Sequence, residues 1–222
     1  MNNSYISIAL DGPGGAGKST VAQEVAARLN IGYLDTGAMY RAMGLYMKEH
    51  GVNLEDQDAI TSHVPEAKVT VVYQGTEQHT FLNGEDVSER IREADISAAA
   101  SAVGANELVR KCLVESQQEI ARGNSVVMDG RDIGTCVLPN ATLKVYLTAD
   151  VRERAMRRFK QKAEGTFEEV LEQLIKRDYN DIHRKFSPLR KAEDAIELDS
   201  THMTQEEVID EIIRLAKERS CR

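Results

Sequence analysis

Short apolar runs alternate along the chain with longer stretches in which apolar residues recur at helical spacing. Five runs have the length of strands: Tyr5–Leu10, Ile31–Leu34, Ser125–Met128, Leu143–Leu147 and Ala195–Leu198. The spacing predicts helices at about 18–29, 38–50, 105–122, 150–163, 166–185 and 204–219. Three of them begin with Asp or Thr followed three residues later by Glu, a capping-box spacing, at Asp150, Thr166 and Thr204. Strands that alternate with helices indicate an α/β fold with a central parallel sheet of five strands flanked by helices.

One segment departs from this alternation. Two β-rich runs, Lys68–Tyr73 and His79–Leu82, are joined through Gly75, and Asn83-Gly84 follows as a strong turn signal. Short antiparallel strands inside an α/β pattern predict a β-rich insertion at about 64–98, at the mouth of the sheet.

Composition and charge limit the class of partner. A chain of 222 residues suggests one domain with a modest insertion, and the net charge of −8 argues against a surface built to hold nucleic acid. The three cysteines share no spacing typical of a disulfide framework or a zinc site. The first basic residue is Lys18, and no apolar run approaches the roughly 20 residues that cross a bilayer. We therefore expect a cytoplasmic protein without a membrane partner.

A phosphate-binding loop follows the first predicted strand. Gly12, four further residues and then Gly17-Lys18-Ser19 match the P-loop pattern, between a strand and a helix. Its backbone N–H groups can surround a di- or triphosphate, Lys18 can reach the β and γ phosphates, and Ser19 can bind Mg²⁺. We predict that the chain binds a nucleoside triphosphate through nine residues: Gly12, Pro13, Gly14, Gly15, Ala16, Gly17, Lys18, Ser19 and Thr20.

A P-loop is compatible with hydrolysis coupled to a switch or with transfer of the γ-phosphate to an acceptor. The sequence has no Asn-Lys-x-Asp guanine motif and no apolar strand that ends in Asp-Glu to polarise a hydrolytic water. It has instead many arginines suited to a second anion, which favours transfer.

Two arginine-containing motifs lie at predicted strand ends. In the first, at 35–41, Asp35 or Thr36 can cap a helix that carries Arg41; a plain capped helix with a solvated arginine remains the alternative. The second, Asp129-Gly130-Arg131-Asp132, follows an apolar run, where the ligand crevice of an α/β sheet lies. Asp129 fits a carboxylate associated with Mg²⁺ or one that only orients the neighbouring loop.

Two later helices carry charged residues three and four positions apart, so that they share a face. The first set is Arg154, Arg157 and Arg158; the second is Arg177, Asp181 and Arg184. A surface pair between Arg177 and Asp181 is the plainer interpretation of the second set. Residues 150–191 nevertheless hold 12 Lys and Arg against 8 Asp and Glu in an otherwise acidic chain. This excess suits a lid that closes over phosphates, at about 150–165.

At these residues the chain resembles the bacterial-type cytidylate kinases, a family of P-loop nucleoside monophosphate kinases. The resemblance runs nearly end to end, through residues 8–13 and the P-loop, 35–41, 127–135, Arg177-Asp178, Arg184, Pro188-Leu189 and 198–201. It implies a P-loop kinase fold with a nucleoside-monophosphate-binding region at 36–110 that includes the insertion, and an arginine-rich lid. It implies transfer of the γ-phosphate of ATP to CMP or dCMP with Mg²⁺, by a protein that we expect to be a monomer.

The resemblance also implies roles for individual residues. Thr36 and Asp132 would read the exocyclic amine of cytosine, with Arg110 reaching the base. Arg41, Arg131 and Arg184 would hold the acceptor phosphate, and Ser101, Arg177 and Asp181 would contact the sugar. The lid arginines would cover the transferring phosphoryl group, with Lys18, Arg131, Arg157 and Arg158 as the catalytic cations.

The chemistry of the bases supports this assignment, because cytosine offers an amine where uracil offers a carbonyl, and a buried carboxylate pairs only with the amine. Two alternatives remain open: another small-molecule P-loop kinase, such as a UMP kinase or a metabolite kinase, and a nucleotide-dependent switch that hydrolyses ATP without an acceptor.

Overall fold

The computed structural model describes residues 5–74, 77–93, 95–161 and 165–220. Cys221, the connecting Gly75 and residues 162–164 of the predicted lid lie outside the described residues. The chain divides into two compact units, a first formed by Met1–Tyr33 with Gly123–Arg222 and a second formed by Leu34–Arg122. No helix among the described residues is long and apolar enough to cross a membrane.

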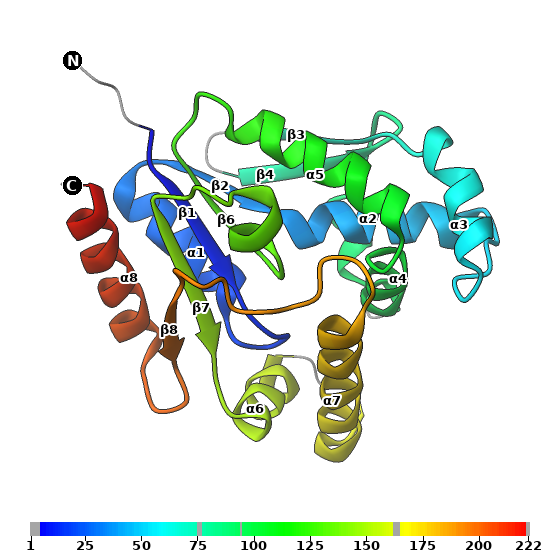
Figure 1. The fold of residues 1–222 in the computed structure, drawn as a ribbon. Helices are drawn as coiled ribbons and strands as arrows, with labels where there is room; N and C mark the ends of the chain where they lie inside the picture. The colour runs from blue at the N-terminus through cyan, green and yellow to red at the C-terminus, as the bar shows by residue number, and fades with distance from the viewer. Residues whose placement is uncertain (1–4, 75–76, 94, 162–164, 221–222) are drawn as a thin grey trace. The chain divides into compact units, whose positions relative to one another are not determined.

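The sheet has the five strands that the sequence predicts, in the order β2-β6-β1-β7-β8, and belongs to the first unit except for Leu34 and Asp35 at the end of β2 (Figure 1). Its strands are β1 (Ser7–Asp11), β2 (Gly32–Asp35), β6 (Val126–Gly130), β7 (Leu143–Thr148) and β8 (Ile196–Asp199). The pairs of β1 with β6, β1 with β7, and β7 with β8 are all parallel. Asp11 at the end of β1 is level with Gly130 of β6 and Tyr146 of β7, so the polar residues after these strands meet at one edge of the sheet.

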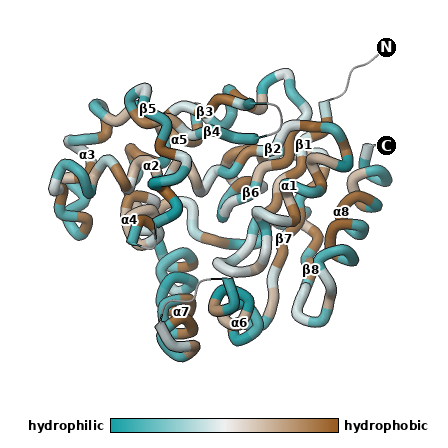
Figure 2. The backbone as a smooth tube through the Cα atoms, turned by 180° about the vertical axis from the view of Figure 1, so that it is seen from behind, coloured by the Kyte–Doolittle hydropathy of each residue, from teal (hydrophilic) through white to brown (hydrophobic). Residues whose placement is uncertain are grey.

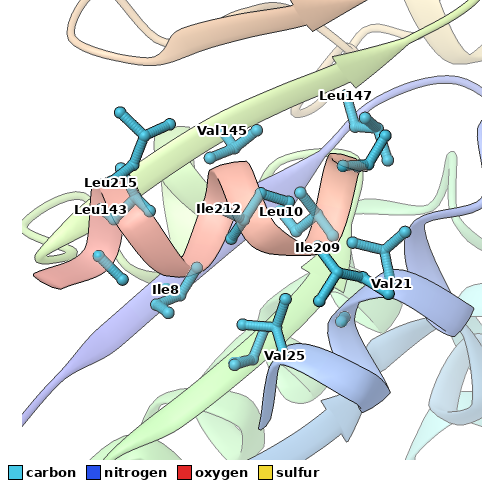
Figure 3. Packing of buried hydrophobic residues seen from close by; sticks show 14 of the residues in the cluster. Ile8, Leu10, Val21, Val25, Leu143, Val145, Leu147, Ile209, Ile212 and Leu215 are labelled. Atoms are coloured by element: carbon cyan, nitrogen blue, oxygen red, sulfur yellow. The ribbon is translucent and has the colours of Figure 1, made fainter. Parts of the chain in front are cut away.

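Helices α1 (Lys18–Leu29) and α8 (Gln205–Ser220) pack on each other and on this sheet. Their buried side chains, among them Val25 and Ile212, join Ile8, Leu10 and Val145 in one apolar cluster (Figure 3). Burial of this apolar area holds the sheet against the two helices and fixes the strand ends that carry the polar residues.

Helices α6 (Val151–Gln161) and α7 (Phe167–His183) complete the first unit and pack on each other through a small apolar cluster around Ala155 and Leu174. Most of α6 is hydrophilic in Figure 2. The predicted capping box at Thr166 is present, with both reciprocal hydrogen bonds to Glu169. At the end of β6 the chain forms a five-residue π-helical turn, Ile133–Val137, which the sequence analysis did not predict.

The second unit contains the predicted β-rich insertion. Strands β3 (Val69–Gln74) and β4 (Glu77–Leu82) pair in antiparallel register, and β4 pairs in turn with β5 (Glu85–Asp86). The third strand was not predicted. It forms because Asn83 and Gly84 both adopt positive φ, 50° and 88°, which reverses the chain in two residues.

Four α-helices accompany this small sheet. They are α2 (Thr36–Glu49), α3 (Gln57–His63), α4 (Ile96–Val103) and α5 (Glu107–Ala121), with short 3₁₀ turns at Val64–Glu66 and Arg90–Arg92. The sequence predicted α2 and α5 but not α3 or α4. Helix α4 lies against α2 at Gly44, where a Cβ would come within 2.9 Å of the backbone of Ala99 and Ala100. A glycine is therefore required at this crossing.

Candidate active site

The P-loop adopts a backbone that only glycines allow. Gly12, Gly15 and Gly17 have φ of 150°, 76° and 88°. A Cβ on Gly12 would lie 2.0 Å from the carbonyl oxygen of Leu147, so the loop passes directly against β7. The predicted phosphate-binding loop is thus formed by close packing on the sheet, and it leads directly into the N-terminus of α1.

Lys18 is buried at the start of α1, and its Nζ donates a hydrogen bond of 2.7 Å to the carbonyl oxygen of Pro13 in the same loop. Burial lowers the pKa of Lys18, and the positive charge of Arg131 lowers it further. The Lys18 ammonium group is therefore held by the loop near the positive charge of Arg131. A bound anion would stabilise both charges.

Ser19, Asp129 and Tyr33 form a polar chain beside the loop. The Ser19 hydroxyl donates to Asp129 Oδ2 at 2.8 Å, and the Tyr33 hydroxyl donates to Asp129 Oδ1 at 3.0 Å. No group of three or more His, Cys, Asp or Glu that could bind a metal by itself exists among the described residues. Two oxygen donors fit Mg²⁺ well when phosphates and water complete its shell. Tyr33 was not anticipated from the sequence.

Asp11 links the loop to the segment after β6. Its carboxylate accepts hydrogen bonds of 2.7 Å from the backbone N–H groups of Ile133 and of Gly134. Burial raises the pKa of Asp11 to about 6, although these two hydrogen bonds act to lower it. Asp11 belongs to the predicted motif, but its local sequence does not indicate this contact.

Five of the residues predicted for the acceptor belong to the same unit as Asp11: Arg131, Asp132, Arg177, Asp181 and Arg184. Arg131 Nε donates to Asp181 Oδ2 at 2.9 Å, and Arg184 Nη2 lies 3.7 Å from Asp132 Oδ1. Burial acts to raise the pKa of Asp181, but the charges of Arg131 and Arg177 outweigh it and the pKa is lowered. Asp181 is buried and bonded to Arg131, so it is not half of a solvent-exposed pair with Arg177.

The three arginines of α6 are held in different ways. Arg154 is buried and donates to the carbonyl oxygens of Ala149 and Gly14 and to Asp178 Oδ2, at 2.8, 2.9 and 2.7 Å. Arg157 donates to Ser200 Oγ at 3.1 Å and to the Ser200 carbonyl oxygen at 2.7 Å. Burial lowers the pKa of Arg158. Arg154 therefore supports the P-loop, a role that its helical spacing does not reveal.

In the second unit, Asp35 caps α2 and orients Arg41. Its Oδ1 accepts the Ala38 N–H at 2.9 Å, and its Oδ2 accepts Arg41 Nη2 at 2.8 Å. Of the two predicted caps, Asp35 is the one that acts, and Thr36 is the first helical residue and buried. The Nε of Arg41 is buried and has no hydrogen-bond partner in the part of the chain that the structure describes. A buried N–H donor without a protein partner is suited to bind an anion.

Two further predicted residues belong to the second unit. Arg110 is buried on α5, lies 5.3 Å from the centre of the Tyr40 ring, and donates to the Gly104 carbonyl oxygen at 3.2 Å. Ser101 is half-buried on α4. Gln78 of β4 was not predicted, and it contacts both backbone polar groups of Asp35.

The glycine-dependent loop at the start of α1, the parallel sheet and the strand order define a P-loop kinase fold. Comparison with solved structures agrees: a gluconokinase from Sinorhizobium meliloti superposes with a TM-score of 0.52 at 10% identity, over 96% of this chain and 92% of that chain.

Comparison of sequences gives the family. The cytidylate kinase family model matches residues 8–218. A cytidylate kinase of Ligilactobacillus salivarius is 47% identical over 97% of this chain and 98% of its own length, and one of Halalkalibacterium halodurans is 45% identical over 96% and 98%. The chain belongs to the cytidylate kinase family and is a phosphotransferase.

Proposed function

We propose that the protein transfers the γ-phosphate of ATP to CMP or dCMP, giving ADP and CDP or dCDP. The observation that carries the proposal is that one unit holds both the P-loop and, near the adjacent strand end, the partly buried pair Arg131–Asp181 and the buried pair Arg184–Asp132. A transferase needs cations for two anionic substrates, and the family supplies the identity of the acceptor.

On the donor side, the residues 12–20 bind the phosphates of ATP and Lys18 neutralises charge on the β and γ phosphates. Ser19 and Asp129 hold Mg²⁺, directly or through water. When bound, Mg²⁺ supplies neutralisation of the β and γ oxygens. Tyr33 keeps the Asp129 carboxylate turned toward Ser19 through its 3.0 Å hydrogen bond.

On the acceptor side, Asp132 and Thr36 recognise the exocyclic amine of cytosine, and Arg110 contacts the base. The acceptor phosphate is bound by Arg41, Arg131 and Arg184, and the sugar by Ser101, Arg177 and Asp181. The buried Nε of Arg41 supports its part in this assignment, since a phosphate oxygen would give that donor its missing partner.

The chemistry is a direct in-line transfer. An ionised acceptor phosphate needs no general base, so the protein positions the two nucleotides and neutralises the equatorial oxygens. Arg157 and Arg158, from the lid at 150–165, cover the transferring phosphoryl group and exclude water. The region 36–110 binds the nucleoside monophosphate.

We further propose that the protein works in the cytoplasm, as a monomer, on free nucleotides. The net charge of −8 gives little attraction for nucleic acid or for anionic lipid surfaces. Light scattering coupled to gel filtration tests the monomer: a mass near the 24.7 kDa of one chain supports it, and twice that mass contradicts it.

ADP release from Mg·ATP, measured side by side with CMP, dCMP, UMP, AMP, GMP and no acceptor, tests the function. We expect strong activity with CMP and dCMP, weak activity with UMP and almost none in the other reactions, with CDP and dCDP recovered as products. Faster release with UMP would indicate a UMP kinase, and equal rates with and without an acceptor would indicate an ATPase.

A further inference from the structure

Gln78, on strand β4 of the insertion, is bonded to the backbone of Asp35 at two points. Its Oε1 accepts the Asp35 N–H at 2.7 Å, and its Nε2 donates to the Asp35 carbonyl oxygen at 3.2 Å. A side-chain amide thereby takes the place that a neighbouring strand would take beside the last residue of β2. Both residues belong to the second unit, 43 positions apart in the chain.

The orientation of this amide follows from its partners. The Asp35 N–H can only donate and the Asp35 carbonyl can only accept, so the Gln78 oxygen must face the first and the nitrogen the second. The Gln78 Nε2 also lies 3.4 Å from Thr80 Oγ1 on the same strand. Thr80 is buried, and its N–H donates to Ser88 Oγ at 2.9 Å. The amide is therefore anchored in the small sheet.

Asp35, whose backbone is bonded to Gln78, in turn binds Arg41 through its side chain. Its two carboxylate oxygens are divided between the Ala38 N–H, at the start of α2, and Arg41 Nη2. A change in the backbone of Asp35 therefore moves the helix N-terminus and the guanidinium together. The Nε of Arg41, buried without a partner among the described residues, is the donor whose direction this arrangement sets.

We infer that Gln78 is a positioning residue for the acceptor phosphate: it fixes Asp35, which fixes Arg41. The inference rests on the proposed function, in which Arg41 binds that phosphate. Because binding by Arg41 is made in the ground state as well as the transition state, its misplacement should raise the KM for CMP more than it lowers kcat. The triphosphate site contains none of these contacts.

Steady-state kinetics of Gln78→Ala test this. We expect the KM for CMP to rise roughly three- to tenfold, the range that loss of a hydrogen-bonded contact gives, while kcat and the KM for ATP change less than about twofold. Gln78→Glu keeps the acceptor for the Asp35 N–H but places an oxygen against the Asp35 carbonyl, so it should be impaired at least as much. Gln74→Ala, at the exposed end of β3 on the same hairpin, is the matched control and should match wild type.

A double mutant distinguishes a specific effect of Gln78 on Arg41 from a general destabilisation of the insertion. In an Arg41→Ala background, Gln78→Ala should add no further increase in the KM for CMP, because the residue it positions is gone. Fully additive effects would overturn the inference, and so would a Gln78→Glu enzyme with the wild-type KM for CMP.

Amide hydrogen exchange by NMR gives a readout that does not depend on catalysis. The Asp35 amide should exchange faster in Gln78→Ala than in wild type. Its exchange rate in Gln74→Ala should equal that in wild type. If the Asp35 amide is as well protected in Gln78→Ala as in wild type, Gln78 does not fix the Asp35 backbone, and the inference is wrong whatever the activity of the variant. Wild-type enzyme that fails to release ADP with CMP would instead contradict the proposed function, so the two failures are distinguishable.

Discussion

Arginines of both units are paired with carboxylates, but in the second unit a neutral amide also holds the backbone of the carboxylate residue. In the first unit, arginines are paired with carboxylates or with the P-loop backbone: the partly buried Arg131 with Asp181, and the buried Arg154 with Asp178 and the Gly14 carbonyl oxygen. In the second unit, one capping carboxylate orients Arg41, and a neutral amide, Gln78, holds that carboxylate's backbone.

This difference has a consequence for how each region responds to change. Removal of one partner from a buried charge pair leaves an uncompensated charge, which is costly, whereas loss of a neutral hydrogen bond costs about 0.5–1.5 kcal/mol. Substitution of a buried partner such as Asp178 in the first unit should therefore cost more stability than loss of the Gln78 hydrogen bonds. The second unit can be adjusted by substitutions in its insertion with smaller effects.

We expect the largest effect at Lys18. Lys18→Ala removes the cation inside the P-loop, and kcat should fall about 10²–10³-fold, the cost of losing one donor aimed at transition-state charge. The measurement is ADP release at saturating CMP, with folding checked by thermal melting. Lys217→Ala, on the exposed side of α8, is the control. A kcat of Lys18→Ala within threefold of the wild-type value would show that Lys18 has no role in the reaction.

Asp11 tests the pH dependence of the first unit. Its pKa is raised to about 6 from an ordinary value of 3.8, so the folded state binds the proton more tightly than the unfolded state. The resulting stabilisation is fully present below pH 3.8 and is lost as the pH rises through 6, by up to about 3 kcal/mol.

Urea unfolding of wild type and Asp11→Asn between pH 4 and pH 7.5 measures this contribution. The free energy of unfolding of wild type should fall relative to that of the variant as the pH rises. Gln78→Ala keeps Asp11 and should therefore follow the pH dependence of wild type. Parallel curves for wild type and Asp11→Asn would contradict the raised pKa.

Asp132 tests base selection. Asp132→Ala should lower the preference for CMP over UMP, as the ratio of their kcat/KM values, about 10–100-fold, because it removes the carboxylate that we propose as the acceptor for the cytosine amine. The KM for ATP should stay near wild type. Asp132→Asn, which can donate to a uracil carbonyl, should also lose the preference. Asp58→Ala, exposed on α3, is the control. Loss of ATP affinity with an intact CMP preference would refute the assignment.

The smallest effect is expected at a helix cap far from any of these contacts. Thr166→Ala removes the capping box of α7 and should lower the free energy of unfolding by about 1 kcal/mol without a change in the KM for CMP. Thr166→Ser, which keeps the hydroxyl, should retain most of the stability. Urea unfolding of the three proteins measures this, and an unchanged stability of Thr166→Ala would show that the cap contributes nothing.

The elements that the sequence predicted are those with strong local signals. Helix α1 has the predicted bounds, and all five strands of the sheet lie within two residues of their predicted ends. Helix α4 was not predicted, although its buried residues Ile96, Ala99, Ala100 and Val103 have helical spacing; it is only eight residues long and begins inside the segment assigned to the β-rich insertion. The unpredicted β5 is only two residues long, too short for a pattern.

The candidate site divides in the same way. The P-loop and the cap at Asp35 are local patterns, and sequence spacing suffices to predict them. Gln78, Tyr33 and Asp11 act through contacts with residues 43, 96 and 122 positions away in the chain, so only the fold can reveal them. The roles of the predicted arginines toward the nucleotides stay predictions for the kinetic tests above.

The central position of β1 has a consequence for synthesis on the ribosome. Both neighbours of β1 are encoded far downstream, and the Ile6 N–H bonds to Ser125, 119 residues later. At 5–20 residues per second, that interval lasts on the order of ten seconds. The contiguous Leu34–Arg122 unit is synthesised in full during the delay. A nascent chain therefore holds the complete Leu34–Arg122 segment while its P-loop still lacks the two strands that neighbour β1 in the sheet.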